Sequence, residues 1–269
     1  MKANQKLGTI MKELVWFSLP LILSGVLQQL YNWADAFIVG NVDGELSLSA
    51  IGVTTTPINF FITTITGFTL GLSVLIAKNF GAKKQENIPP VLAVFAVILG
   101  VVFLLIAAGG SALSYPFMAL LHTPSDTIGL ASSYIRIIFL GLPFLAVYNV
   151  YTATLRGLGD SRIPFLSILL SSIVNVLLDI LFVAEFRWGV QGAATATVLS
   201  QATMTVFIVI YGTRKYRWLK SGYRKENFCS SVVREGVRFG LPPMLQSSIS
   251  SLGGLVLQDF MNRFGTDTV

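Results

Sequence analysis

The stretch Ser171-Ser-Ile-Val-Asn175-Val-Leu-Leu-Asp179-Ile-Leu-Phe-Val183 is apolar enough to lie inside a membrane, yet it carries an amide and a carboxylate four residues apart. A helix places residues i and i+4 on one face, so Asn175 and Asp179 share a face of the predicted helix. An Asp at the centre of a bilayer costs about 2.5–3.5 kcal/mol on insertion scales, and such residues usually have a function. The pair therefore predicts a functional site within a membrane-spanning helix.

The composition of the whole chain indicates an all-α polytopic membrane protein. Of the 269 residues, 53% are apolar and 12% are charged, whereas a soluble domain carries about 25% charged residues. Backbone polar groups must be satisfied within lipid, so we expect long α-helices. Seven stretches are long enough to cross about 30 Å of hydrocarbon, near residues 14–38, 54–77, 91–113, 130–155, 163–184, 192–212 and 239–258.

The distribution of Lys and Arg predicts the orientation of these helices. With a cytoplasmic N-terminus, most of the 19 basic residues fall in cytoplasmic segments, including Arg156 and Arg162 in one turn and a dense group in 213–238. This positive-inside bias predicts a multi-pass protein of the plasma membrane. It also accounts for the net charge of +6 without a nucleic-acid partner.

An internal repeat predicts two lobes. Phe17-Ser-Leu-Pro20 and Phe239-Gly-Leu-Pro242 each follow a basic, polar segment and open an apolar span, and they are separated by about the length of a six-helix unit. Repeats of this kind build transporters from two related halves. We expect a six-helix lobe over residues 1–212, a basic cytoplasmic linker over 213–238, and the first helix of an incomplete second lobe over 239–269.

Polar faces on three predicted helices could form one pocket. Asn175 and Asp179 lie on the predicted span 163–184. Polar side chains at helical spacing on the first and sixth spans would join them, namely Gln28, Asn32, Asp35, Thr197 and Gln201. Carboxylate, amide and hydroxyl oxygens suit a proton relay or a hard cation such as Na⁺. Pro20 removes a backbone hydrogen bond and makes the first helix the expected moving part.

No sequence motif of an enzyme is present. The chain has no Walker motif, no His–Glu zinc pair and no Gly-x-Ser-x-Gly elbow, and its only cysteine is Cys229. We therefore expect no enzymatic activity and no resident cofactor. His122 lies beside Pro124 in a short loop and is expected to be a solvated loop residue.

Several motifs together resemble the multidrug and toxic compound extrusion (MATE) antiporters. They are Ser18-Leu-Pro20 followed by Asp35-Ala-Phe-Ile-Val-Gly40, Gly71-Leu-Ser-Val-Leu-Ile-Ala77 followed by Gly81-Ala, Leu155-Arg-Gly-Leu-Gly-Asp160-Ser-Arg162-Ile-Pro164, and Asn175-Val-Leu-Leu-Asp179. The resemblance extends over essentially the whole chain. It implies a twelve-helix, two-lobe protein that exports organic cations or amphipathic drugs in exchange for H⁺ or Na⁺.

The resemblance also assigns roles to individual residues. It implies a coupling-cation site, for H⁺ or Na⁺, at Asp35, Asn175, Asp179 and Thr197. A tyrosine of the family's network corresponds to Tyr134, with Tyr148 as the alternative, and the bend of the first helix corresponds to Pro20. Gln28, Asn32 and Gln201 are expected to line the substrate cavity or take part in gating. The missing C-terminal lobe and the lipid bilayer are the expected partners.

Two other functions are compatible with the sequence. A flippase for lipid-linked intermediates, from a related branch of the superfamily, would need a cavity rich in Arg to bind pyrophosphate. We see no Arg in the middle of a predicted span. A membrane fragment that does not transport is the second alternative.

Overall fold

The computed structural model describes residues 2–263, with side chains from residue 11 onward, and confirms the all-α architecture. No strand occurs within residues 2–263. The predicted segment 239–269 extends into residues 264–269, which lie outside the described part. The long helices are α1 (Lys2–Val42), α2 (Glu45–Gly81), α3 (Ile88–Ala112), α5 (Ile128–Gly157), α6 (Arg162–Asp179), α7 (Gly189–Lys215) and α8 (Ser230–Asn262). The shorter elements are η1 (Gln85–Asn87), α4 (Ser114–Leu120), the π-helical turn η2 (Ile180–Glu185), η3 (Arg217–Tyr223) and η4 (Lys225–Asn227).

Six of the seven predicted membrane spans are helices with the length and hydropathy needed to cross a bilayer. They correspond to α1, α2, α3 with η1, α5, α6 with η2, and α7. The seventh predicted span, 239–258, lies within α8, which is long but does not belong to this group. The reason is the polar run Gln246-Ser-Ser-Ile-Ser-Ser251, which lowers the hydropathy of α8.

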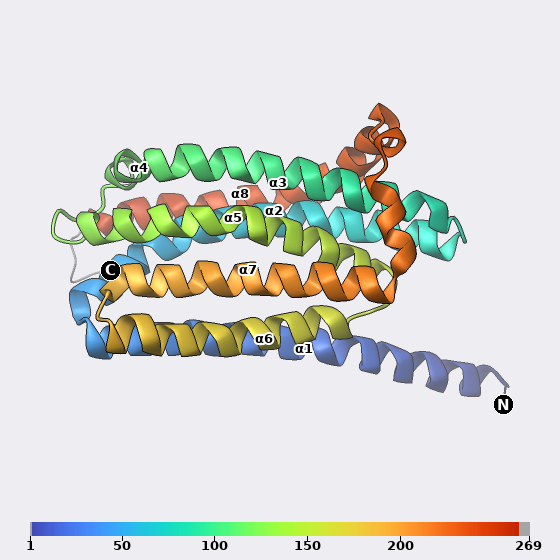
Figure 1. The fold of residues 1–269 in the computed structure, drawn as a ribbon, viewed down its shortest axis with the longest axis horizontal. Helices are drawn as coiled ribbons and strands as arrows, with labels where there is room; N and C mark the ends of the chain where they lie inside the picture. Colours follow the sequence, from blue (N-terminus) through green and yellow to red (C-terminus); the bar gives the residue numbers. More distant parts are fainter. Residues whose placement is uncertain (1, 264–269) are drawn as a thin grey trace.

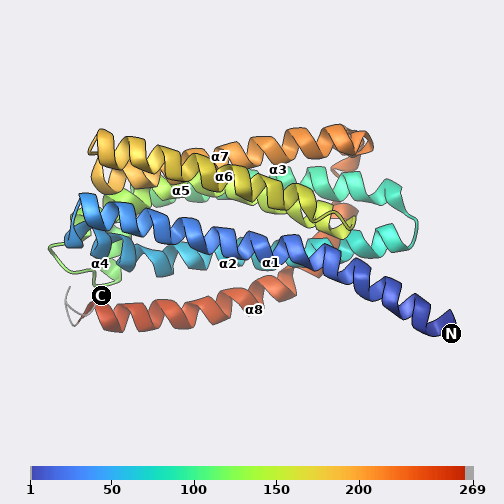
Figure 2. The same cartoon turned by 90° about the horizontal axis from the view of Figure 1, so that it is seen from below.

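The long helices run roughly side by side in one elongated bundle (Figures 1 and 2). In the centre, α5 packs against α2, α3 and α7, and α6 joins α7 to α1. The N-terminal end of α1 projects beyond the bundle at the end where α7 leads into η3 (Figure 1). The fold therefore places α1, α6 and α7 next to one another, as a shared site on these three helices requires.

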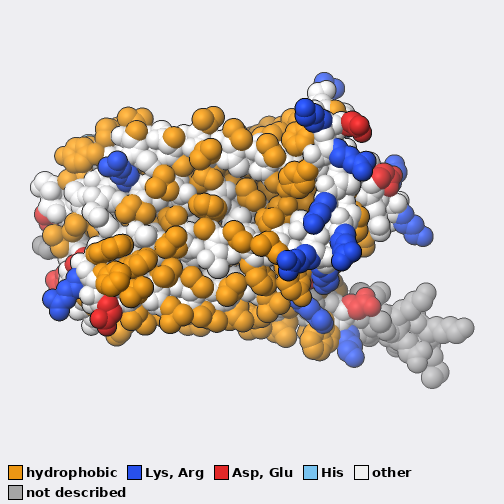
Figure 3. Space-filling model, in the orientation of Figure 1, with side chains coloured by type: hydrophobic (Ala, Val, Ile, Leu, Met, Phe, Trp, Pro, Cys, Tyr) orange, Lys and Arg blue, Asp and Glu red, His pale blue; other side chains and the backbone are white. Residues whose placement is uncertain are grey.

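The surface of the bundle is divided into an apolar body and a basic end. Large side chains such as Phe37 and Leu105 are 71% and 68% exposed along the body, as expected for groups that face lipid rather than water. Lys and Arg side chains gather at one end of the molecule, around the segment that follows α7 (Figure 3). This is the basic segment on which the predicted orientation depends.

The α2–α8 contact is unusually close and rich in small polar residues. Hydroxyl groups link the two helices, with Thr63 Oγ1 2.6 Å from Ser251 Oγ and Thr64 Oγ1 2.9 Å from Ser248 Oγ. A Cβ atom on Gly71 would overlap the backbone carbonyl of Phe239. Small residues and interhelical hydroxyl bonds are the usual means by which helices associate in lipid. The contact joins α8 to the six-helix bundle.

Candidate functional site

A polar cavity of about 210 Å³ lies among α1, α2, α5 and α7. Its polar lining includes Asp35 from α1, Tyr134 from α5, and Thr197 and Gln201 from α7. Asp35 is only 8% exposed, and its Oδ1 has no hydrogen-bond partner among the described residues. With Asn32 of α1, five of the residues predicted from sequence therefore line one cavity.

The amide and carboxylate of α6 are buried more deeply than Asp35. Asn175 is 1% exposed and Asp179 is fully buried. Both polar atoms of each side chain lack a hydrogen-bond partner within the described part of the chain. Leaving a buried polar group unpaired costs about 1–3 kcal/mol, and more when it is charged. Four unpaired atoms on successive turns of α6 are thus an unstable arrangement unless a ligand or proton occupies them.

The carboxyl groups of α1 and α6 belong to one electrostatic cluster. Asp179 and Asp35 are close enough for their charges to interact. The hydroxyls of Tyr31 and Tyr134 lie within electrostatic range of both carboxyl groups without a hydrogen bond to them among the described residues. Neither Asp forms an ion pair with a Lys, Arg or His in the described residues. The cluster carries two acidic groups in an apolar bundle with no basic group to balance them.

The backbone changes where the cluster ends. The α-helix α6 ends at Asp179 and continues directly as the π-helical turn η2. Single π-helical turns occur preferentially at functional sites, because they re-aim side chains and free backbone groups. The stretch that the sequence marks as functional is therefore also the place where regular α-helical geometry ends.

This arrangement can hold a proton or a small cation. Two carboxylates and an amide offer oxygen atoms, which are the ligands that hard cations prefer. A positive charge would offset the repulsion between the carboxylates and satisfy their unpaired oxygens. Tyr134 and Thr197 line the cavity beside Asp35 and can add further oxygen contacts there, whereas Asn175 and Asp179 are not among the residues that line it.

Some predicted residues lie outside the centre of the cluster. Asn32 lines the cavity but is exposed, and Gln28 is exposed at the surface of α1, beside Tyr31. Pro20 lies within α1, which continues as one helix through it, and Ser24 Oγ donates to its carbonyl oxygen at 2.7 Å. The alternative tyrosine, Tyr148, lies elsewhere, with its hydroxyl 3.5 Å from the carbonyl oxygen of Pro164.

Tyr31 belongs to the cluster, although it is not among the residues predicted from the sequence. It lines the cavity with Asp35, four residues farther along the same helix. The i, i+4 spacing is a signal that could have found it. Tyrosine is common in apolar helices, so the spacing alone does not distinguish it from a packing residue.

The prediction that His122 is a solvated loop residue is confirmed by its exposure, and the structure adds a contact that the sequence does not predict. Its Nδ1 lies 2.7 Å from Oδ1 of Asp259, near the end of α8, and the backbone of His122 has a positive φ of 50°. Arg263 also contacts the carboxylate, with its Nη2 3.0 Å from Oδ2 of Asp259. The His122 side chain is half-exposed, as predicted, but it joins a loop to α8 instead of being only solvated.

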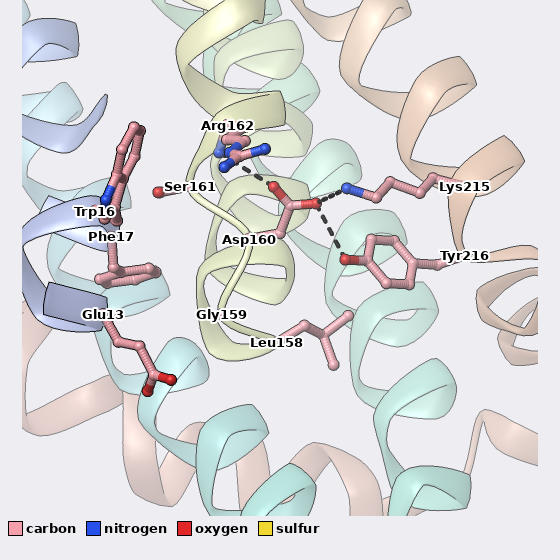
Figure 4. A pocket seen from close by; sticks show the side chains of 10 residues that line it. All are labelled: Glu13, Trp16, Phe17, Leu158, Gly159, Asp160, Ser161, Arg162, Lys215 and Tyr216. Atoms are coloured by element: carbon pink, nitrogen blue, oxygen red, sulfur yellow. Dashed lines mark hydrogen bonds and ion pairs between the residues drawn. The ribbon is translucent and has the colours of Figure 1, made fainter. Parts of the chain in front are cut away.

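A second polar pocket, of about 400 Å³, lies at the basic end of the bundle between α1 and the α5–α6 turn. Lys215 and Tyr216 approach Asp160 from the side opposite Trp16 (Figure 4). Lys215 Nζ donates to Oδ2 of Asp160 at 2.7 Å, and the Tyr216 hydroxyl donates to the same oxygen at 3.1 Å. Burial opposes ionisation of Asp160, but these donors and the charge of Lys215 hold its pKa below the ordinary value. The pair fixes the α5–α6 turn to the end of α7.

Comparison with known proteins identifies the family. The family model MatE matches residues 20–181, a segment that includes Asp35, Asn175 and Asp179 but ends before Thr197. The chain belongs to the MatE family. It is 30% identical to the "Probable multidrug resistance protein YpnP" of Bacillus subtilis over 266 residues, which cover 97% of this chain and 58% of the relative. It is 31% identical to the "Probable multidrug resistance protein YoeA" of the same organism, over 96% of this chain and 58% of that relative.

Solved structures of MATE transporters share the fold. The chain aligns with an "outward-facing conformation of a multidrug resistance MATE family transporter of the MOP superfamily" with a TM-score of 0.79 and 29% identity. The alignment covers 90% of this chain and 52% of that one. The family expected from the sequence is confirmed. The chain spans 58% of the length of the two Bacillus relatives and 57% of the length of the "Multidrug export protein MepA" of Staphylococcus aureus.

Proposed function

We propose that this protein takes part in multidrug efflux, exporting organic cations or amphipathic drugs in exchange for H⁺ or Na⁺. Residues 1–212 would form the lobe that binds the coupling cation. The segment 213–238 would link it to a second lobe that begins with 239–269 and completes the drug cavity. In this proposal the protein is a transporter of the plasma membrane with a cytoplasmic N-terminus, and it is not an enzyme.

The buried acidic cluster is the observation that carries the proposal. Asp35, Asn175 and Asp179 place five unpaired polar atoms inside a bundle that belongs to a transporter family. A purely structural role would be served at lower cost by an amide or a hydroxyl, because these groups carry no charge to be desolvated. In a site that binds and releases a cation, by contrast, the ligand atoms have no partner when the cation is absent.

The coupling mechanism follows from the position of the cluster between helices. When a proton or Na⁺ neutralises the carboxylates, repulsion between α1 and α6 falls and the two helices can pack more closely. When the cation leaves, the restored charge favours a more hydrated arrangement of the cavity. Pro20 gives α1 a position at which it can bend without breaking a further backbone hydrogen bond. The two packings would open the drug cavity to opposite sides of the membrane.

The flippase alternative has less support. A pyrophosphate group would need Arg side chains in the cavity, and the cavity around Asp35 is lined by acidic, amide, hydroxyl and apolar residues without Arg. The names of the relatives, which refer to multidrug resistance and export, also favour drug efflux.

The test is ethidium accumulation in a drug-sensitive bacterial host that expresses the protein from its own gene. We expect lower accumulation than in cells with an empty vector, and a return to the empty-vector level with Asp35→Asn or Asp179→Asn. Asp43→Asn is the matched control, because this carboxylate lies between α1 and α2 and accepts a hydrogen bond from Ser47 at 2.6 Å. Undiminished efflux in both cluster variants, or no efflux by the unmodified protein, would overturn the proposal.

A further inference from the structure

A third, smaller cavity lies between α2 and α5 and is lined by a half-buried arginine. It measures about 70 Å³, and its polar lining consists of Thr66, Thr69, Ser73, Asn149, Thr152 and Arg156. No residue lines both this cavity and the one around Asp35. The sequence predicts Arg156 in a cytoplasmic segment, and the structure places it in the last turn of α5, half-buried beside α2. The physical reason is that Gly157 packs against Ile76 and brings the end of α5 close to α2.

Arg156 has no charged partner among the described residues. Its Nε atom is buried and makes no hydrogen bond, and Arg156 forms no ion pair within the described residues. The neutral hydroxyl of Tyr148 is close enough to interact with it. Burying even part of an unpaired guanidinium is costly, because no described carboxylate replaces the hydration that its Nε loses. Arg156 therefore lacks a negatively charged partner among the described residues, and the cavity beside it is large enough to hold a small anion.

The cavity offers hydrogen-bond donors and no acidic group. Thr66 and Thr69 already donate to backbone carbonyl oxygens of α2, and Asn149 uses one of its two amide hydrogens in the same way on α5. The buried hydroxyl of Thr152 makes no hydrogen bond of good geometry within the described chain, although it lies within bonding range of the Tyr148 hydroxyl. Together with the guanidinium, Thr152 and the remaining amide hydrogen of Asn149 form a set of donors that faces one small space.

We propose that this cavity binds a small monovalent anion, either a halide or a carboxylate group, on Arg156 with Thr152 and Asn149. A charge-assisted bond to a guanidinium is about twice as strong as a neutral one. One water molecule needs only about 10–15 Å³ of cavity volume. A cavity of about 70 Å³ can therefore hold one small anion with ordered water, but it is too small for a drug. This inference does not depend on the cation site and would stand if the efflux proposal failed.

The test is the thermal unfolding midpoint of the purified chain in lipid nanodiscs, with chloride substituted for gluconate at constant Na⁺ and ionic strength. Gluconate is a carboxylate, but its six-carbon chain is too large for a cavity of about 70 Å³. A ligand that binds only the folded protein raises the midpoint as its concentration rises. We expect a saturable rise with chloride. Formate, tested in the same way, distinguishes the two sources: a rise with chloride alone indicates a halide site, and a rise with formate indicates that carboxylates are accepted.

Variants assign the effect to the cavity. Arg156→Gln should abolish the rise, and Thr152→Val, which keeps the side-chain volume, should shift the half-saturating chloride concentration upward by about fivefold to tenfold. The control Arg136→Gln removes an exposed arginine from the same helix and should leave the rise unchanged. Asp35→Asn should also retain it. The proposal is overturned if neither anion raises the midpoint of the unmodified chain, or if the rise persists in Arg156→Gln and is unaltered in Thr152→Val.

Discussion

Replacing Asp179 with Asn should make the protein more stable while removing its proposed function. The carboxylate is fully buried, and neither of its oxygens has a hydrogen-bond partner among the described residues. Asn has nearly the same shape, so the substitution removes the charge without opening a cavity. Functional groups that are kept at the expense of stability are typical of binding sites. A residue that served only to hold α6 in place would show the opposite effect.

The magnitude follows from the number of unpaired atoms. An unsatisfied buried polar group costs about 1–3 kcal/mol, and a charged one costs more. Asn keeps a polar amide in the same place, so only part of that cost is recovered, and we expect a gain of about 1–2 kcal/mol. For a chain of this size, 1 kcal/mol corresponds to about 2–4 °C in the unfolding midpoint. The expected rise is therefore about 2–8 °C.

The assay is thermal unfolding in nanodiscs in a buffer without Na⁺, followed by intrinsic fluorescence. Asp43→Asn again serves as the control, and it should change the midpoint little or lower it by loss of the bond from Ser47. Adding Na⁺ should raise the midpoint of the unmodified chain if Na⁺ is the coupling ion, and should have no such effect on Asp179→Asn. A clear fall in the midpoint of Asp179→Asn would refute the reasoning, since it would assign the carboxylate a structural contact.

Three further changes test other parts of the structure. Gly71→Ala should lower the unfolding midpoint, because its Cβ would overlap the carbonyl of Phe239 and overpacking costs about 1–3 kcal/mol. The ion pair of Asp160 should stabilise the protein by about 1 kcal/mol or less, since its lysine partner is half-exposed. Because the pKa of Asp160 is lowered in the folded state, this stabilisation should be present above the ordinary pKa of 3.8 and be lost as the pH falls through the lowered value. Denaturation of the unmodified protein and of Asp160→Asn at several pH values will show this loss. Tyr134→Phe should weaken cation binding severalfold in a binding assay while Tyr148→Phe leaves it unchanged, because Tyr134 lines the acidic cavity and Tyr148 does not.

The sequence was sufficient to predict the long helices, because their apolar runs extend well beyond the length of a bilayer core. It was not sufficient for α4 (Ser114–Leu120), which has too few residues to show a period and packs against α5. The π-helical turn after Asp179 was also missed, since no local pattern distinguishes it from continued α-helix. The hydropathy of α8 was overestimated because its serines are interspersed with apolar residues.

Much of the candidate site could be predicted because helical spacing places polar residues on one face. That rule placed Asn175 beside Asp179 and Asn32 near Asp35. It does not specify where a neighbouring helix covers that face, and so it included Gln28, which the structure leaves exposed. Contacts between distant segments gave no local signal. The hydrogen bond between His122 and Asp259 joins residues 137 positions apart.

The most direct test of the acidic cluster is infrared difference spectroscopy of the purified chain in nanodiscs, comparing high with low pH and Na⁺ with a Na⁺-free buffer. If Asp35 and Asp179 bind the coupling cation, carboxyl bands will respond to at least one of these changes, and Asp35→Asn and Asp179→Asn will each remove part of that response. Asp43→Asn will keep the cluster's bands. Difference spectra that are the same in the unmodified chain and in both cluster variants would contradict the assignment of the coupling site.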